Sequence, residues 1–137
     1  MSKIYLKRSQ LAELIDHSRS TYPEEACGIL SGKDGRVSHV YKVKNISPTP
    51  ATRYFIDSQE QLKIFKEIDA DNLEIVGIYH SHAHSPAYPS TTDCQLAFYP
   101  DASYLIISLS NPENPVVKSY RISEGKIKEE EVKIYGD

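Results

Sequence analysis

The chain has 137 residues, with 16 lysines and arginines against 19 aspartates and glutamates, and its formal net charge is −3. Compact domains commonly run ~100–150 residues, so residues 1–137 are predicted to form a single domain. The charge balance is slightly acidic and the sequence has no lysine- or arginine-rich run, which argues against a nucleic-acid partner.

The start of the chain and the cysteines bear on where the protein works. Residues 1–8 lack the apolar core of a signal peptide, and no apolar run is long enough to span a bilayer. We therefore expect a cytoplasmic protein without a membrane partner. Cys27 and Cys94 are too few for a disulfide framework and should be reduced. Cys27 is expected to be a small core residue, and Cys94 stays open as an alternative metal ligand.

The first third of the chain indicates a strand, a helix and a hairpin. Residues 3–6 favour a short strand, after which Ser9 could cap an amphipathic helix. That helix should end before Pro23, because proline disfavours the α conformation in the residue before it. Strands are then predicted at residues 25–31 and 36–44, joined by a glycine-containing turn.

The middle of the chain indicates a loop, a second helix and a buried strand. Residues 45–52 are rich in proline and serine and predict a loop, and residues 53–56 are interpreted as an edge strand of the sheet. The segment Ser58–Gln61 fits a capping box that opens a helix to about Ala70. The β-rich residues 74–79 predict the strand that follows.

The last third continues the mixed pattern. Two prolines in residues 85–89 predict a loop, and a helix is expected over residues 91–98. Strands are predicted at residues 104–109, 116–122 and 126–134. This alternation of elements predicts one α/β or α+β domain.

A candidate metal site lies at the end of the strand that precedes residue 80. Side chains at i and i+2 share one face of a strand, so His80 and His82 could converge on one ion. Asp93, in the first turn of the next predicted helix, could point back toward them. Imidazole and carboxylate are good zinc ligands, and three such ligands leave the fourth tetrahedral position free for water.

Each of these residues also has an ordinary structural explanation. A histidine pair can be a satisfied polar pair at a strand end, and Ser90 to Asp93 also fits a capping box at a helix N-terminus. Glu25, upstream, could be a surface carboxylate, and Glu24 competes with it for any role. Only the joint occurrence of all these residue types favours one active site.

The combined pattern resembles a known family. His80-x-His82, followed by Ser90 and Asp93, is similar to the motif of the JAMM (MPN+) metallopeptidases, and Glu25-x-x-Gly28 is similar to their upstream glutamate motif. Further segments resemble the bacterial subgroup of CysO-cysteine peptidases. These segments are Tyr79–His82, Ala87–Ser90, Thr92–Asp93 and Ser119–Ile122. One departure is Ala83, which stands where many relatives have proline.

The resemblance implies a fold and a set of roles. The fold would be a single MPN/JAMM domain, cytidine deaminase-like, with a mixed, mainly antiparallel sheet flanked by helices. One zinc ion per chain would be held by His80, His82 and Asp93, with a bound water as the fourth ligand. Glu25 would act as the general base, and Ser90 would donate a hydrogen bond to the carbonyl oxygen as it gains negative charge.

The resemblance also implies a substrate. It is a ubiquitin-like sulfur-carrier protein cut after its C-terminal Gly-Gly, which releases cysteine or trims the tail. Arg53, Tyr54 and Phe55 would help to hold that tail by strand addition. His84 could contact substrate, be solvated or share the metal. The alternatives are an isopeptidase that removes ubiquitin-like modifiers from lysine and a non-catalytic scaffold domain, and the oligomeric state is not predicted.

Overall fold

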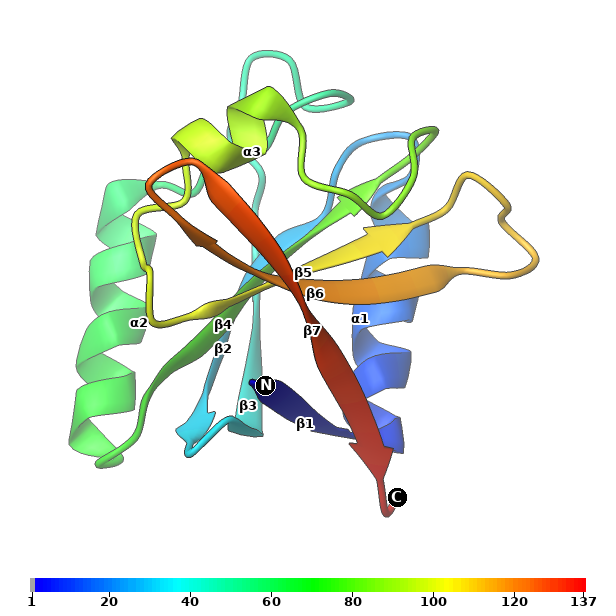
Figure 1. The fold of residues 1–137 in the computed structure, drawn as a ribbon. Helices are drawn as coiled ribbons and strands as arrows, with labels where there is room; N and C mark the ends of the chain where they lie inside the picture. The colour runs from blue at the N-terminus through cyan, green and yellow to red at the C-terminus, as the bar shows by residue number, and fades with distance from the viewer. Residues whose placement is uncertain (1) are drawn as a thin grey trace.

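The computed structural model describes residues 2–137. These residues form seven strands and three helices (Figure 1). The elements in chain order are β1 (Lys3–Lys7), α1 (Arg8–Thr21), β2 (Cys27–Lys33), β3 (Arg36–Val43), α2 (Ser58–Ala70), β4 (Glu74–His82), α3 (Thr91–Gln95), β5 (Ser103–Ser108), β6 (Val116–Ser123) and β7 (Lys126–Tyr135).

The strands pair in the order β1-β3-β2-β4-β5-β6-β7, and the sheet closes on itself as a barrel. The pairs β2–β3, β2–β4, β5–β6 and β6–β7 are antiparallel. The pairs β4–β5, β1–β3 and β1–β7 are parallel. The predicted mixed sheet is therefore confirmed. Its closure through β1 has no local sequence signal, because it depends on pairing between the two ends of the chain.

Two helices flank the sheet on opposite sides, and α3 lies beyond one end of it (Figure 1). Ile64 of α2 belongs to one hydrophobic cluster, which includes Ile106 of β5. Leu14 of α1 belongs to another, which includes the neighbouring Leu105 and Ile107. Successive strand residues point to opposite faces, so β5 contributes to both cores. Within residues 2–137, no helix has the length and apolar character needed to cross a membrane.

The helix boundaries differ from those expected. The N-cap of α1 is Lys7, whose backbone N–H donates to the Gln10 side chain at 2.8 Å, and not Ser9. The N-cap of α2 is Asp57, whose carboxylate accepts from the Glu60 N–H at 3.1 Å. In α2 the capping side chain lies one residue before the expected Ser58, and in α1 the N-cap makes no side-chain cap hydrogen bond. Sequence patterns therefore locate helix starts only approximately. Helix α3 ends at Gln95, before residue 98.

The expected edge strand at residues 53–56 is wrong. Only Ile56 pairs, in an isolated antiparallel bridge with Asn45. The Asn45 side chain accepts a hydrogen bond from the Phe55 N–H and donates one to the Arg53 carbonyl, both at 3.0 Å. These two contacts occupy backbone groups that a neighbouring strand would use, so the segment stays irregular.

Candidate metal centre

Strand β4 brings His80 and His82 together. It lies between β2 and β5, where His80 is paired with Cys27 on one side and Ile106 on the other. The two histidines share one face of the strand, and their Nε2 atoms are 3.1 Å apart. Their exposed fractions are only 1% and 4%, so the imidazoles are largely removed from solvent.

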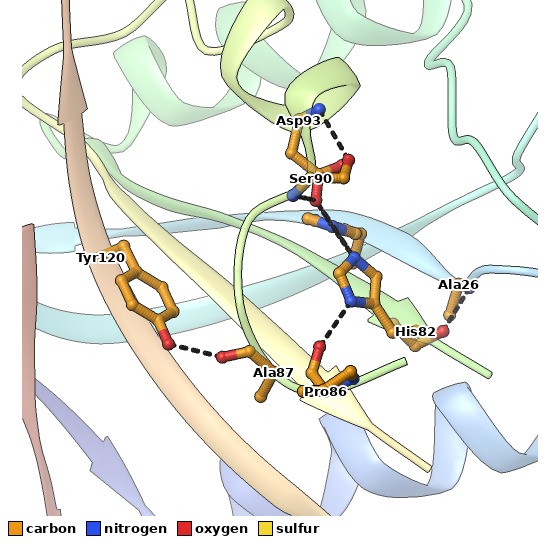
Figure 2. Close-up of polar contacts among 9 residues, drawn as sticks. Ala26, His82, Pro86, Ala87, Ser90, Asp93 and Tyr120 are labelled. Carbon is orange, nitrogen blue, oxygen red and sulfur yellow. Dashed lines mark hydrogen bonds and ion pairs between the residues drawn. The ribbon is translucent and has the colours of Figure 1, made fainter. Parts of the chain in front are cut away.

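Asp93 reaches the histidines from the first turn of α3. Its Oδ2 lies 3.0 Å from His80 Nε2 and 3.1 Å from His82 Nε2. The same oxygen accepts the Ser90 N–H at 2.9 Å, while Ser90 Oγ accepts the Asp93 N–H at 3.0 Å (Figure 2). The capping box and the cluster therefore coexist, and the cap fixes the carboxylate that faces the two imidazoles.

The three ligand atoms fit a metal ion. A tetrahedral zinc ion with bonds of roughly 2.0–2.1 Å separates its ligand atoms by roughly 3.3 Å, and the three atoms here are 3.0–3.1 Å apart. His82 Nδ1 donates to the Pro86 carbonyl oxygen at 2.8 Å, so the neutral imidazole would offer its Nε2 lone pair to a metal ion (Figure 2). Two imidazoles and a carboxylate form a donor set suited to zinc.

Burial and the contacts within the cluster shift the pKa values of its three members. Burial alone would raise the pKa of Asp93, but hydrogen bonds from His80 and His82 hold this pKa well below its usual range. Burial lowers the pKa of His80. Burial also acts to lower the pKa of His82, but the Asp93 carboxylate and the Pro86 carbonyl outweigh it and raise this pKa. A carboxylate that stays ionised is the form that binds a cation.

Glu25 lies beside the cluster, just before β2. Its side chain is only 4% exposed, and Oε1 has no hydrogen-bond partner among residues 2–137. Burial raises the pKa of Glu25 to about 8, with the charge on His82 opposing this shift and that on Asp93 adding to it. The neighbouring Ala26 is paired with Ser81 of β4 through hydrogen bonds of 2.8 and 3.0 Å, which fixes Glu25 relative to the histidines.

A pocket of about 290 Å³ adjoins the cluster and is lined by Glu25, His82, Ser90 and His84. Ser90 and His84 are exposed. The remaining lining residues come from two loops, and they are Ala51, Thr52, Ala83 and Ser85. The structure therefore brings the expected base, the expected hydroxyl donor and one expected ligand to a single cavity.

Of the expected substrate contacts, Tyr54 lies against His80. The ring of Tyr54 is buried and stacks on His80, with centroids 4.6 Å apart. Tyr54 and Phe55 line a second, mostly apolar pocket. Arg53 is exposed and lines neither of these two pockets. The structure thus leaves the predicted substrate contacts of these residues as predictions.

The cysteines take no part in the cluster, which consists of His80, His82 and Asp93 among the described residues. Cys27 is fully buried, and burial raises the pKa of its thiol to about 12. Cys94 is half-buried, and burial raises its pKa as well. Neither thiol has the low pKa of a nucleophile or of a metal ligand.

Two residues that hold the loop between the histidines and α3 carried no site signal in the sequence. The Tyr120 hydroxyl donates to the Ala87 carbonyl oxygen (Figure 2), and Ser108 Oγ donates to the Ser85 carbonyl oxygen at 2.7 Å. Both come from strands that follow the loop in the chain. The segment Ser119–Ile122 was noted for its resemblance alone, and no local pattern could assign Tyr120 a role.

The matches to known proteins agree with this geometry. Residues 7–123 match the family described as prokaryotic homologues of the JAB domain. The chain belongs to the prokaryotic JAB family. The JAMM/MPN resemblance of the sequence is therefore confirmed, since this family contains the same domain.

Relatives of this JAB protein carry peptidase names. It is 42% identical over 124 residues to the CysO-cysteine peptidase of Mycobacterium tuberculosis, covering 88% of this chain and 84% of the relative. It is 34% identical over 113 residues to a desampylase of Haloferax volcanii, covering 78% of this chain and 81% of the relative.

Solved structures share the fold of this JAB protein. A protein of Desulfitobacterium hafniense superposes with a TM-score of 0.87 at 39% identity, covering 98% of this chain and 94% of that one. A JAB1/MPN domain protein of Archaeoglobus fulgidus gives a TM-score of 0.67 at 18% identity, covering 98% and 100%. The predicted MPN/JAMM fold class is confirmed.

Proposed function

We propose that this JAB-family protein is a zinc-dependent peptidase that hydrolyses the amide bond after the C-terminal Gly-Gly of a ubiquitin-like sulfur-carrier protein. The reaction would release cysteine or trim the tail of the carrier. The observation that carries this proposal is the convergence of His80, His82 and Asp93 on one point beside the buried Glu25. The identity of 42% to a CysO-cysteine peptidase supports a carrier protein as substrate.

The chemistry divides between the metal and the chain. His80, His82 and Asp93 would hold zinc, which supplies Lewis-acid activation of water and of the scissile carbonyl. Glu25 would accept the proton of the attacking water and hand it to the departing nitrogen. Glu25 lines the same pocket as His82, which places its carboxylate where it can accept this proton and return it.

Ser90 would stabilise the negative charge that develops on the carbonyl oxygen. Its Oγ already accepts the Asp93 N–H at 3.0 Å, which orients the side chain. The hydroxyl proton of Ser90 is therefore the group left to donate to the substrate. A donor held in advance at the position where charge develops lowers the barrier without further reorganisation.

A diglycine tail suits the surroundings of the cluster. The Tyr54 ring lies against His80, and Thr52 lines the pocket on the His82 side. Glycine residues let a peptide backbone approach such a site without side-chain clashes. No covalent intermediate is needed, which agrees with the raised pKa values of Cys27 and Cys94.

The second candidate is an isopeptidase that removes a ubiquitin-like modifier from lysine. The identity of 34% to a protein named desampylase favours it. Both candidates use the same hydrolytic centre and differ only in the leaving amine. A non-catalytic scaffold is disfavoured, since Glu25 Oε1 is buried with no hydrogen-bond partner among residues 2–137, and such an oxygen destabilises a fold that makes no use of it.

Two matched substrates separate these candidates. A ubiquitin-like carrier that ends in Gly-Gly-Cys is compared with the same carrier joined through Gly-Gly to a lysine ε-amine. Each is incubated with zinc-loaded protein and weighed intact by mass spectrometry. We expect the carrier to lose the residue after its Gly-Gly faster from the α-linked substrate. Faster loss from the lysine substrate would favour the isopeptidase, and intact carriers in both reactions would contradict the proposed function.

A further inference from the structure

Two pockets lie next to the histidine pair, one through Tyr54 and the other through His82. The first contains Tyr54, whose ring stacks on His80, and its lining is mostly apolar. The second contains His82 itself, together with Glu25 and Ser90. One loop contributes to both, with Thr52 lining the second pocket and Tyr54 the first. A peptide bound at the cluster therefore has two separate cavities within reach.

The position of Glu25 determines which segment occupies which pocket. In the proposed reaction the departing nitrogen receives its proton from Glu25, so the residue that carries this nitrogen must lie where Glu25 is exposed to the substrate. Glu25 lines only the second of these two pockets. The carrier tail would then occupy the side of Tyr54, and the leaving residue would occupy the side of His82.

The second pocket suits a small leaving residue. Its volume of about 290 Å³ lies at the lower limit of small-molecule sites, which run from roughly 300 to 1,000 Å³. Away from the cluster, its walls are formed by short side chains, namely Ala51, Thr52, Ala83 and Ser85. A single small amino acid fits this space better than a folded acceptor protein, whose lysine would have to enter with its backbone outside.

His84 is the one residue of the outer wall that is both long and polar. Its ring is exposed and forms no hydrogen bond with any of residues 2–137. The Tyr22 ring, from the segment after α1, contacts it edge-on with centroids 5.6 Å apart and so limits its rotation. An imidazole N–H at this wall is therefore free to donate to a bound ligand.

We propose that this pocket binds the leaving amino acid and that His84 donates a hydrogen bond to its free α-carboxylate. This inference rests on the proposed peptidase function and adds the specificity of its leaving group. The hydroxyl groups of Thr52 and Ser85 line the same pocket and are further donors for the carboxylate. His84 thereby favours a C-terminal amino acid over a lysine side chain, which brings no carboxylate to this position.

The test compares two carriers that differ only in the chemical group at the C-terminus. One ends in Gly-Gly-Ala with a free carboxylate, and the other ends in the same residues with a carboxamide. A hydrogen bond to a charged group supports a preference of roughly tenfold in kcat/KM for the carboxylate in the wild-type protein. The variant His84→Ala should reduce this preference to less than twofold, and His84→Asn, which retains an N–H donor, should recover part of it.

Two controls keep the result specific to His84. The exposed His39 lies on β3, so His39→Ala should leave the preference unchanged. Bound zinc, measured by elemental analysis, should be equal in the wild-type protein and in His84→Ala. Loss of zinc from His84→Ala would overturn the inference by assigning His84 to the metal instead.

The possible failures are distinguishable. An equal carboxylate preference in the wild-type protein and in His84→Ala, or no preference in either, would overturn the inference while leaving the peptidase function intact. If the zinc-loaded wild-type protein cleaves neither carrier, the proposed function itself is contradicted and the inference is overturned with it.

Discussion

The ring of Tyr54 lies almost parallel to the ring of His80, with centroids 4.6 Å apart and an interplanar angle of 22°. His80 Nδ1 is buried and has no hydrogen-bond partner among residues 2–137, unlike His82 Nδ1, which donates to the Pro86 carbonyl oxygen at 2.8 Å. Stacking on Tyr54 is thus a contact that helps to orient the His80 ring from outside the cluster.

This relationship predicts a weaker metal site in Tyr54→Leu. Aromatic stacking contributes about 1 kcal/mol beyond burial, so the Kd for zinc should rise about fivefold. Competition with a fluorescent zinc chelator measures this change. Tyr54→Phe preserves the ring and is the matched control, with a Kd within twofold of the wild-type value. Equal zinc affinity in Tyr54→Leu and Tyr54→Phe would contradict the role of the ring.

The raised pKa of Glu25 should make the stability of the metal-free protein depend on pH. Its pKa is raised from 4.5 to about 8 in the fold, so the fold favours the protonated carboxyl group. This contribution to stability is complete below the unfolded-state pKa and is lost as the pH rises through the folded-state value. The free energy of unfolding should therefore fall by up to about 1.4 kcal/mol per pH unit between these two values.

The variant Glu25→Gln isolates this effect, because its side chain does not titrate. Urea unfolding of the EDTA-treated protein is measured at several pH values. The free energy of unfolding should fall less steeply with pH for Glu25→Gln than for the wild-type protein. Glu24→Gln, at the exposed neighbouring position, should keep the wild-type slope. If all three proteins share one slope, Glu25 is not the group responsible.

Metal removal should destabilise the fold. Asp93 Oδ2 and the two imidazole nitrogens lie within 3.1 Å of one another in a buried site, so the folded chain presents all three to one cation. The unfolded chain does not hold them together, so a bound cation stabilises the folded state. A ligand at a hundredfold excess over its Kd stabilises the folded state by about 2.7 kcal/mol, or roughly 8 °C in Tm for a domain of this size. Differential scanning fluorimetry should show this shift on adding zinc to the wild-type protein and a smaller one for Asp93→Asn. An unchanged Tm would argue against a buried metal site.

The hydrogen bond from the Tyr120 hydroxyl to the Ala87 carbonyl oxygen should help to hold the loop that carries His84 and Ser90. Tyr120→Phe leaves the buried carbonyl of Ala87 without its donor, which should lower the free energy of unfolding by about 1–3 kcal/mol. Tyr88→Ala, which removes an exposed ring that packs edge-on against Tyr120, should have a smaller effect. Chemical denaturation measures both, and equal losses would contradict the importance of the hydrogen bond.

The convergence of the two histidines was predictable because its geometry is local. Side chains two residues apart on a strand share a face, and this rule alone brings His80 and His82 together on β4. Asp93 was ambiguous between a helix cap and a ligand. In the structure the two roles are compatible, because one oxygen of Asp93 accepts the Ser90 N–H and faces both imidazoles.

Contacts between distant parts of the chain were not predictable. Tyr22 meets His84 across 62 positions of sequence, and Tyr120 meets Ala87 across 33. Neither contact leaves a periodic or spacing signal. The segment around Phe55 does not form the expected edge strand, because the Asn45 side chain occupies the backbone groups that a strand partner would need.

The central claim, that Glu25 performs proton transfer beside zinc held by His80, His82 and Asp93, is tested most directly by Glu25→Gln. Bound zinc and the rate of hydrolysis of a carrier ending in Gly-Gly-Cys are measured on the same preparation, with Glu24→Gln alongside. We predict one zinc per chain in both variants, with the rate lowered about 10²–10⁴-fold in Glu25→Gln alone. A zinc-loaded Glu25→Gln protein that hydrolyses the carrier at the wild-type rate would contradict the account.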